Sequence, residues 1–194
     1  LADMDLDGLL DLVVANGHID EPVRGVAGRV GYAQPPHLFI NQGAGTFRDL
    51  ASAVGDEFAR PKVGRGLACG DFDRDGDVDL LMTANNGPAR LYRNDQLAGH
   101  TSIRFHLAGT TSNRDAIGAW VEVDLGGRII RQELTVGGGH ASGHLGWMHF
   151  GLGEATQVRL RVLWPNDDGA GASVWHDVRG DAFYVVDKAS GVRE

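Results

Sequence analysis

The chain has 194 residues, of which 42% are hydrophobic and 23% are charged, and its formal net charge is −8. This length and composition are typical of one or two globular domains with a buried core, and they argue against disorder. The acidic balance argues against nucleic acid and anionic membrane surfaces as partners, because both attract patches rich in Lys and Arg. The sequence contains no apolar run long enough to span a membrane. Because Cys69 is the only cysteine, an intrachain disulfide and a cysteine-cluster metal site are excluded.

The first motif of the chain is repeated. The stretch from Asp3 to Leu12 reads Asp-x-Asp-x-Asp-Gly-x-x-Asp-Leu, and the same pattern returns 68 residues later, between Asp71 and Leu80. A second similarity follows each copy, at residues 38–41 and 91–94, where an Asn comes three positions after a Leu. These later similarities are only 53 residues apart. We therefore expect the Gly- and Pro-rich stretch from His18 to Pro36 to be a loop inserted into the first copy.

Short apolar runs bounded by Gly, Asn or Pro accompany each motif, which is typical of β-strands. A repeat of roughly 40 to 60 residues with several short strands favours a β-propeller blade over a helical solenoid. Two blades do not close a ring, and the first motif begins only two residues after the start of the chain at Leu1. We therefore expect it to be the C-terminal piece of a longer protein. The predicted strands of this half span residues 9–15, 38–40, 67–69, 78–84 and 89–92.

The pattern changes from about residue 98. Alternating apolar and polar residues from Trp120 to Leu125 predict a half-exposed antiparallel strand, and Gly126-Gly127 is a strong signal for a two-residue hairpin loop. We find no convincing amphipathic helix. The simplest interpretation is an all-β chain, with two C-terminal blades of a partial β-propeller at residues 1–97 and a small β-sandwich-like domain at 98–194. Its further predicted strands span residues 103–107, 119–125, 128–136, 148–150, 158–163 and 183–186.

The two aspartate motifs are predicted to be calcium loops. Side chains at positions 1, 3 and 5 of a tight loop converge on one point, a carbonyl from position 7 can join them, and Gly at position 6 permits the sharp turn. Ca²⁺ takes about six to eight such hard oxygen ligands. The predicted ligands of two Ca²⁺ sites are the carboxylates of Asp3, Asp5, Asp7 and Asp11 with the Leu9 carbonyl, and the carboxylates of Asp71, Asp73, Asp75 and Asp79 with the Asp77 carbonyl.

Other interpretations of these loops are weaker. An EF-hand requires a Glu at position 12, where this chain has Val14 and Met82. Mg²⁺ prefers fewer protein ligands and keeps several waters. A solvated acidic turn stays open, since Asp and Gly are common in turns, but two copies with matched positions disfavour it. Because Asp11 and Asp79 are followed directly by apolar residues, we expect each loop to lead straight into a strand.

Taken in order, these motifs resemble a known family. The two aspartate loops are similar to the FG-GAP/VCBS repeats of integrin-type β-propellers. The stretches at 113–119, 126–128, 137–139, 149–153 and 162–165 resemble the ASPIC/UnbV domain, which follows such repeats in bacterial proteins. The resemblance implies a calcium-binding protein of the cell surface, the periplasm or the extracellular space, with an adhesive or scaffolding role. It implies no established reaction.

The strongest pattern for catalysis is a group of three histidines, His140, His144 and His149. An H-x-x-x-H spacing can chelate a metal on a helix, but the glycines around it make a helix improbable. His149 also matches a framework position of the family. A nucleophilic triad at Ser142 and a nucleotide-binding glycine loop lack their supporting patterns.

Several other residues have structural interpretations that we favour. The four tryptophans could stack on carbohydrate, but aromatic residues of small β-domains more often lie in the core. Arg114 and Asp115 predict a buried ion pair or a turn lock, and Cys69 predicts a small buried residue. Blade turns are expected at Asn41, Asn85, Asn86 and Asn94.

The sequence therefore predicts a calcium-binding extracytoplasmic module for binding, adhesion or scaffolding. Its expected partner is a protein or carbohydrate of unknown identity, without nucleic acid or a membrane span. The alternative is an enzyme or a biosynthetic protein, with its site on blades outside this sequence or on the loop from His140 to His149.

Overall fold

The computed structural model describes residues 1–20, 31–95, 99–110, 113–139, 142–165 and 174–194. It confirms an all-β chain: the described residues form sixteen strands and one short helix, α2 (Asp56–Ala59), which the sequence did not predict. The chain divides into two compact units. The first holds Leu1–Asp5 and Leu9–Ala98, and the second holds Leu6–Gly8 and Gly99–Glu194. Among the described residues, no helix is long and apolar enough to cross a membrane.

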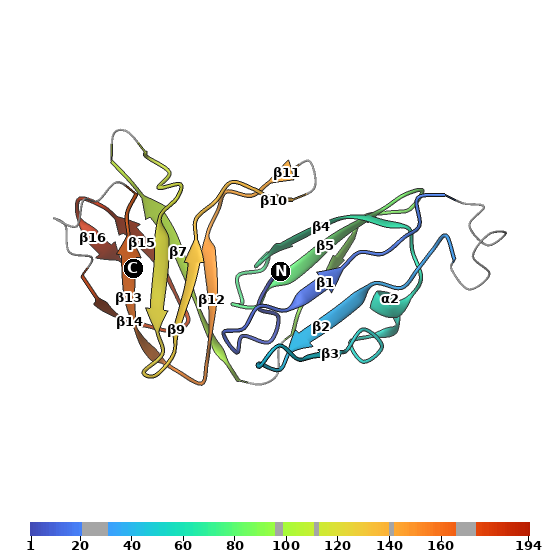
Figure 1. Ribbon diagram of the computed structural model, residues 1–194, viewed down its shortest axis with the longest axis horizontal. Helices are drawn as coiled ribbons and strands as arrows, with labels where there is room; N and C mark the ends of the chain where they lie inside the picture. The colour runs from blue at the N-terminus through green and yellow to red at the C-terminus, as the bar shows by residue number, and fades with distance from the viewer. Residues whose placement is uncertain (21–30, 96–98, 111–112, 140–141, 166–173) are drawn as a thin grey trace. The chain divides into compact units, whose positions relative to one another are not determined.

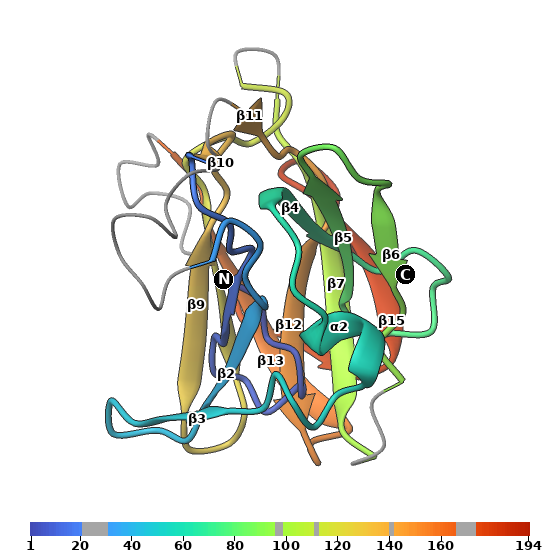
Figure 2. The ribbon, with the colours of Figure 1, turned by 90° about the vertical axis from the view of Figure 1, so that its right-hand side faces the viewer.

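The first unit contains two three-stranded antiparallel sheets, in the orders β1-β2-β3 and β4-β5-β6. The second of these is clearly visible in Figure 2. Each aspartate motif leads directly into a strand, as predicted, and Ala2 pairs with Asp11 as Gly70 pairs with Asp79, 68 residues further along. The strands are β1 (Leu12–Val14), β2 (His37–Asn41), β3 (Phe47–Asp49), β4 (Gly64–Gly70), β5 (Asp79–Ala84) and β6 (Arg90–Tyr92).

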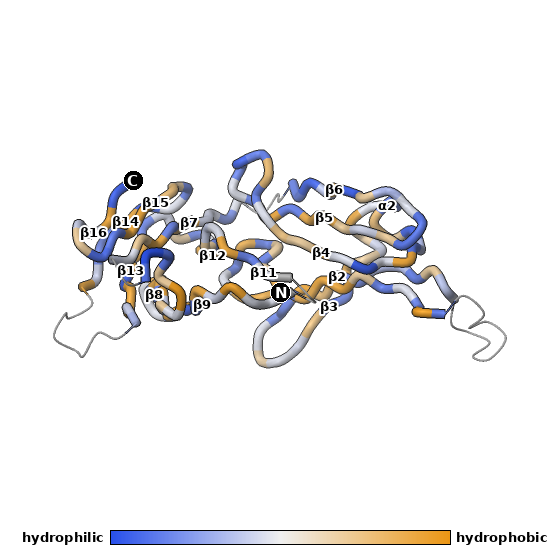
Figure 3. Tube along the Cα trace, turned by 90° about the horizontal axis from the view of Figure 1, so that it is seen from above, coloured by the Kyte–Doolittle hydropathy of each residue, from blue (hydrophilic) through white to orange (hydrophobic). Residues whose placement is uncertain are grey.

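A hydrophobic core holds this unit together. It contains residues that flank both aspartate loops, among them Met4, Val78 and Leu80, together with Ile40 from β2 and Phe58 from α2. Figure 3 shows hydrophobic stretches of the trace on strands such as β2 and β5. Burying such side chains stabilises the fold by about 1.5–3 kcal/mol each. The residues next to the aspartates are therefore held by the core while the carboxylates gather beside them.

The second unit confirms the β-sandwich-like prediction. Two four-stranded sheets, in the orders β12-β7-β15-β16 and β14-β13-β8-β9, share one hydrophobic core. Phe105, Phe150 and Tyr184 come from the first sheet, and Val121 and Leu160 come from the second. A small antiparallel pair also joins β10 (Gly138–Gly139) to β11 (Ser142–Gly143). The sandwich strands are β7 (Thr101–Ala108), β8 (Trp120–Asp124), β9 (Ile129–Glu133), β12 (Met148–Gly153), β13 (Gln157–Leu163), β14 (His176–Arg179), β15 (Ala182–Asp187) and β16 (Gly191–Arg193).

The Gly126-Gly127 hairpin between β8 and β9 is confirmed. The Leu125 amide donates to the Arg128 carbonyl at 2.9 Å, and Gly126 has a φ of 85°. The predicted half-exposed character of β8 is wrong at Glu122, which is 6% exposed. Its carboxylate accepts hydrogen bonds from Arg161 of the neighbouring strand, so pairing compensates for burial of the charge.

Two further interpretations of this unit are corrected. The ion pair of Arg114 and Asp115 is not buried, since their side chains are 88% and 51% exposed and 4.0 Å apart. The turn is closed instead by Asn113, whose side chain bonds the amide and the carbonyl of Ile117. The core position expected for the tryptophans holds only in part: Trp164 packs against the core, whereas Trp147 is 46% exposed.

Candidate metal centres in the two aspartate loops

The two aspartate loops have the same backbone turn. Gly8 and Gly76, at position 6, have φ values of 82° and 106°, in the left-handed region that glycine adopts readily, and they make the sharp turn expected at this position. Leu6 and Arg74, at position 4, are also left-handed, with φ values of 58° and 66°. Residues other than glycine rarely adopt this backbone conformation, and no sequence signal indicated it at position 4. The repeat therefore extends from the residues to the shape of the loop.

Three carboxylates converge in each loop. One carboxylate oxygen from each of Asp3, Asp5 and Asp11 lies within 4.8 Å of the others, and Asp71, Asp73 and Asp79 form the matching group. These are positions 1, 3 and 9 of the motif. The position 5 residues, Asp7 and Asp75, are not members of these groups. The ligand roles predicted for them, and for the carbonyls of Leu9 and Asp77, stay predictions.

Much of this negative charge is buried. Asp3, Asp11 and Asp79 are 5%, 0% and 1% exposed. The Oδ1 atoms of Asp5 and Asp71 are also shielded from solvent. Charges that close together in a medium of low dielectric constant repel one another strongly. A divalent cation at the point of convergence would replace this repulsion by attraction.

Asp11 and Asp79, at position 9, also hold their loops in shape. Asp79 Oδ2 accepts from the Phe72 amide at 2.9 Å, and Oδ1 accepts from the Asn94 amide at 2.8 Å. Asp11 repeats both bonds, from the Met4 amide at 2.7 Å and from the Asn41 amide at 2.8 Å. Each carboxylate oxygen has two acceptor sites, so these bonds leave room for a cation. Asn41 and Asn94 are thus parts of the loop architecture as well as turn residues.

Further hydrogen bonds tighten the second loop. The Asp77 amide donates to Asp75 Oδ1 at 3.0 Å, and the Gly76 amide donates to Asp71 Oδ2 at 3.3 Å. Asp side chains that bond backbone amides a few residues ahead stabilise such turns. Arg93 Nη1 lies 3.9 Å from Asp73 Oδ2, and the Arg93 side chain is 63% exposed. An exposed pair at this distance offsets little of the buried charge.

The three histidines that formed the strongest pattern for catalysis receive little geometric support as a metal site. His140 lies outside the described residues. His144 is exposed, and His149 lies in β12 opposite Arg104 of β7. In the described part of the chain, both groups of metal-capable side chains consist of aspartates alone.

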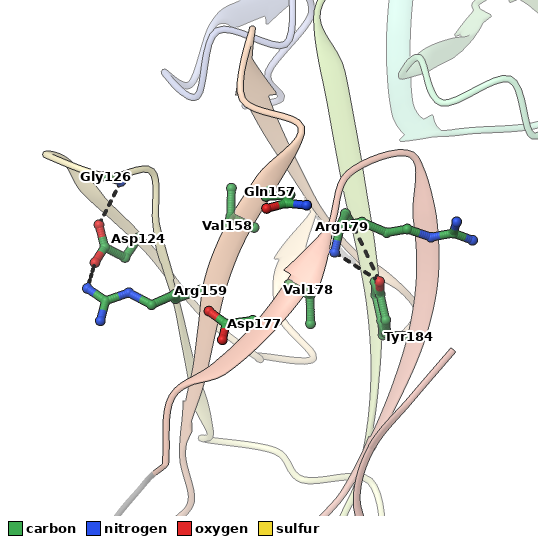
Figure 4. Close-up of a pocket in the computed structure, with 9 residues that line it drawn as sticks. All are labelled: Asp124, Gly126, Gln157, Val158, Arg159, Asp177, Val178, Arg179 and Tyr184. Carbon is green, nitrogen blue, oxygen red and sulfur yellow. Dashed lines mark hydrogen bonds and ion pairs between the residues drawn. The ribbon is translucent and has the colours of Figure 1, made fainter.

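A shallow pocket of about 550 Å³ lies in the second unit, between the start of β13 and the end of β14 (Figure 4). Arg159 on its rim bonds Asp124, and the Arg179 amide donates to Tyr184 Oη at 3.1 Å. The Gly126 amide and then Arg159 hold the pKa of the Asp124 carboxyl below its usual range. The pocket lining contains no His, Cys or Ser.

Two known families match successive parts of the chain. Residues 3–82 match the FG-GAP-like repeat, and residues 109–193 match the family described as ASPIC and UnbV. The chain combines an FG-GAP-like repeat with an ASPIC and UnbV domain. The resemblance predicted from the motifs is therefore confirmed.

Cartilage acidic protein 1 from three vertebrates is similar to part of the chain. The mouse protein is 46% identical over 71 residues, and the human protein is 45% identical over 71 residues. The Xenopus tropicalis protein is 44% identical over 76 residues. These stretches cover 37–39% of this chain and 10–11% of the relatives, so the chain matches about a tenth of their length.

Proposed function

We propose that this chain is a calcium-binding part of an extracellular scaffold or binding protein, in which two Ca²⁺ ions fix the aspartate loops of the FG-GAP-like repeats. The observation that carries this proposal is the duplicated geometry: two loops with the same left-handed positions gather carboxylates from positions 1, 3 and 9. A solvated acidic turn would not require such convergence, nor the burial of Asp3 and Asp79. Hard oxygen donors at this density suit Ca²⁺.

Two comparisons support the proposed extracellular location. FG-GAP-like repeats cover residues 3–82, and the relatives carry the name cartilage acidic protein. Calcium sites of extracellular modules bind with dissociation constants of about 10⁻⁴–10⁻³ M. The proposed partner is a protein or carbohydrate, and the proposed role is binding rather than catalysis.

Calcium that binds the folded state alone stabilises it by mass action. At a concentration ten times the dissociation constant, each site contributes about 1.4 kcal/mol. For a chain of this size, 1 kcal/mol moves the melting temperature by about 2–4 °C. We therefore expect the melting temperature to rise by several degrees between EDTA and 10 mM Ca²⁺, and to rise less in 10 mM Mg²⁺.

Asp73→Ala tests the assignment, because its melting temperature relative to the wild type should differ in direction between EDTA and Ca²⁺. In EDTA it should melt at or above the wild-type temperature, since one repelling charge is gone. In Ca²⁺ it should melt below the wild type, because a ligand is gone. Glu154→Ala, at an exposed residue of the second unit, is the control and should leave the calcium response unchanged. A wild-type melting temperature that is the same in EDTA and Ca²⁺ would overturn the proposal.

A further inference from the structure

A short chain of hydrogen bonds connects the two aspartate loops. In the second loop, Asp79 Oδ1 accepts from the backbone amide of Asn94 at 2.8 Å. The side chain of the same residue, through Nδ2, donates to the Met4 carbonyl at 2.8 Å. Met4 lies in the first loop, and its own amide donates to Asp11 Oδ2 at 2.7 Å. The position 9 carboxylates of the two loops are therefore joined through two residues, Asn94 and Met4.

The corresponding residue of the first repeat does not make such a link. Asn41 uses its backbone amide in the same way, donating to Asp11 Oδ1 at 2.8 Å. Its side chain, however, donates to the Leu10 carbonyl at 3.1 Å, within its own repeat. The two asparagines thus perform the same task inside their loops, but the Asn94 side chain reaches into the other repeat.

The packing around this link favours a rigid connection. Met4 is 7% exposed and belongs to the core of the first unit, and Tyr92, two residues before Asn94, packs against that core. Asp11 and Asp79, at the two ends of the link, are fully buried. A displacement at one end can therefore pass to the other with little absorbed by solvent-exposed side chains.

We propose that Asn94 couples the two calcium loops, so that an ion bound in one raises the affinity of the other. This inference rests on the proposed calcium-binding function and adds its regulation. A cation in the second loop fixes Asp79 and, through it, the Asn94 backbone. The Asn94 side chain then holds the Met4 carbonyl and orders the first loop before its ion arrives. An ordered loop loses less conformational entropy on binding, and the effect is reciprocal between the two sites.

The size of the coupling is bounded by the hydrogen bond that carries it. A neutral hydrogen bond changes an equilibrium constant by about 2- to 10-fold. We therefore expect an ion in one loop to raise the affinity of the other loop by a factor within this range.

Isothermal titration with Ca²⁺ measures this factor directly in the 194-residue chain. In Asp5→Ala only the second loop can still bind Ca²⁺, and in Asp73→Ala only the first loop can. The product of the two wild-type association constants, divided by the product of the two single-site constants, is the coupling factor. We expect a factor of about 2 to 10 in the wild type. In an Asn94→Ala background the factor should fall to one, whereas Asn41→Ala should retain it even if both affinities decrease.

Hydrogen exchange supplies a second test that leaves Asn94 intact. In Asp5→Ala, calcium can load only the second loop, and we expect it to slow amide exchange in residues 2–12 of the first. Unchanged exchange there overturns the coupling, as does a wild-type factor of one or an equal factor in Asn94→Ala. These outcomes leave the proposed function standing, since calcium still binds. Absence of binding in the wild type overturns the proposed function itself.

Discussion

At the scale of single residues, the position 9 aspartates combine two tasks. Asp79 is placed to bind a cation with Asp71 and Asp73, and it also accepts one backbone amide on each of its oxygens. Asp73 lies in the same group, but the hydrogen bond that its Oδ1 accepts from the Asp75 amide is longer, at 3.4 Å. Replacing either residue removes a carboxylate from the proposed site. Replacing Asp79 also removes support for the loop.

This difference predicts distinct outcomes for two matched substitutions. Asp79→Asn keeps one acceptor oxygen but presents an NH₂ group to the second amide, which leaves a partly buried donor unsatisfied. We expect it to lose about 1–3 kcal/mol of unfolding free energy in EDTA. Asp73→Asn should be at least as stable as the wild type there, because its position is more exposed and one repelling charge is gone. Urea unfolding in EDTA measures both, and equal stabilities of the two variants would contradict a structural role for Asp79.

The sequence allowed the aspartates to be predicted as a group of ligands. It did not allow the additional structural role of Asp79 to be predicted. Their repeated spacing and the glycine at position 6 were sufficient to predict two loops that gather carboxylates. One hydrogen-bond partner of Asp11 and one of Asp79 lie 30 and 15 residues away, in Asn41 and Asn94. Such distant partners depend on how the strands pair, and that pairing could not be derived from the local pattern. The repeated Leu-x-x-Asn sequence was the available signal.

At the scale of elements, the hairpin between β8 and β9 depends on one of its two glycines. Gly126 has a φ of 85°, while Gly127 has no such left-handed φ, and an added Cβ would meet nothing within 4 Å at either position. Gly126→Ala should therefore cost about 1 kcal/mol of unfolding free energy through backbone strain alone. Gly127→Ala is the matched control and should have little effect. Chemical unfolding followed by tryptophan fluorescence compares them, and equal losses would contradict this turn geometry.

Element prediction succeeded where local chemistry decides the outcome. The Gly126-Gly127 turn and the central strands of the sandwich carried clear signals. The parallel pairing of β15 with β7 joins residues about 79 positions apart, as in Ala182 with Ile103, and no local pattern encodes it. The burial of Glu122 was missed for a related reason, since it depends on Arg161 from a neighbouring strand. Tertiary partners overrode the alternation that predicted an exposed position.

At the scale of the whole molecule, the two units have separate cores and separate natural probes. All four tryptophans lie between residues 120 and 175, within the second unit. The only cysteine, Cys69, lies in β4 of the first unit, opposite Leu80 of β5. Burial raises the pKa of the Cys69 thiol, so the reactive thiolate is scarce in the folded state. Thiol labelling therefore reports the first unit, and tryptophan fluorescence reports the second.

These two probes can measure which unit Ca²⁺ stabilises. Leu80 directly follows Asp79 and is 4% exposed, while Leu160 is fully buried in the second core. Substitution of either by Ala should cost about 2–5 kcal/mol through the cavity it leaves. In Leu160→Ala, the fluorescence-detected unfolding midpoint should fall while Ca²⁺ still slows labelling of Cys69. In Leu80→Ala, that calcium-dependent protection should be largely lost, because the cavity loosens the strand that holds Asp79. If both substitutions abolish the protection equally, the two cores unfold as one cooperative unit, and calcium stabilises the whole chain rather than the repeats that contain its ligands.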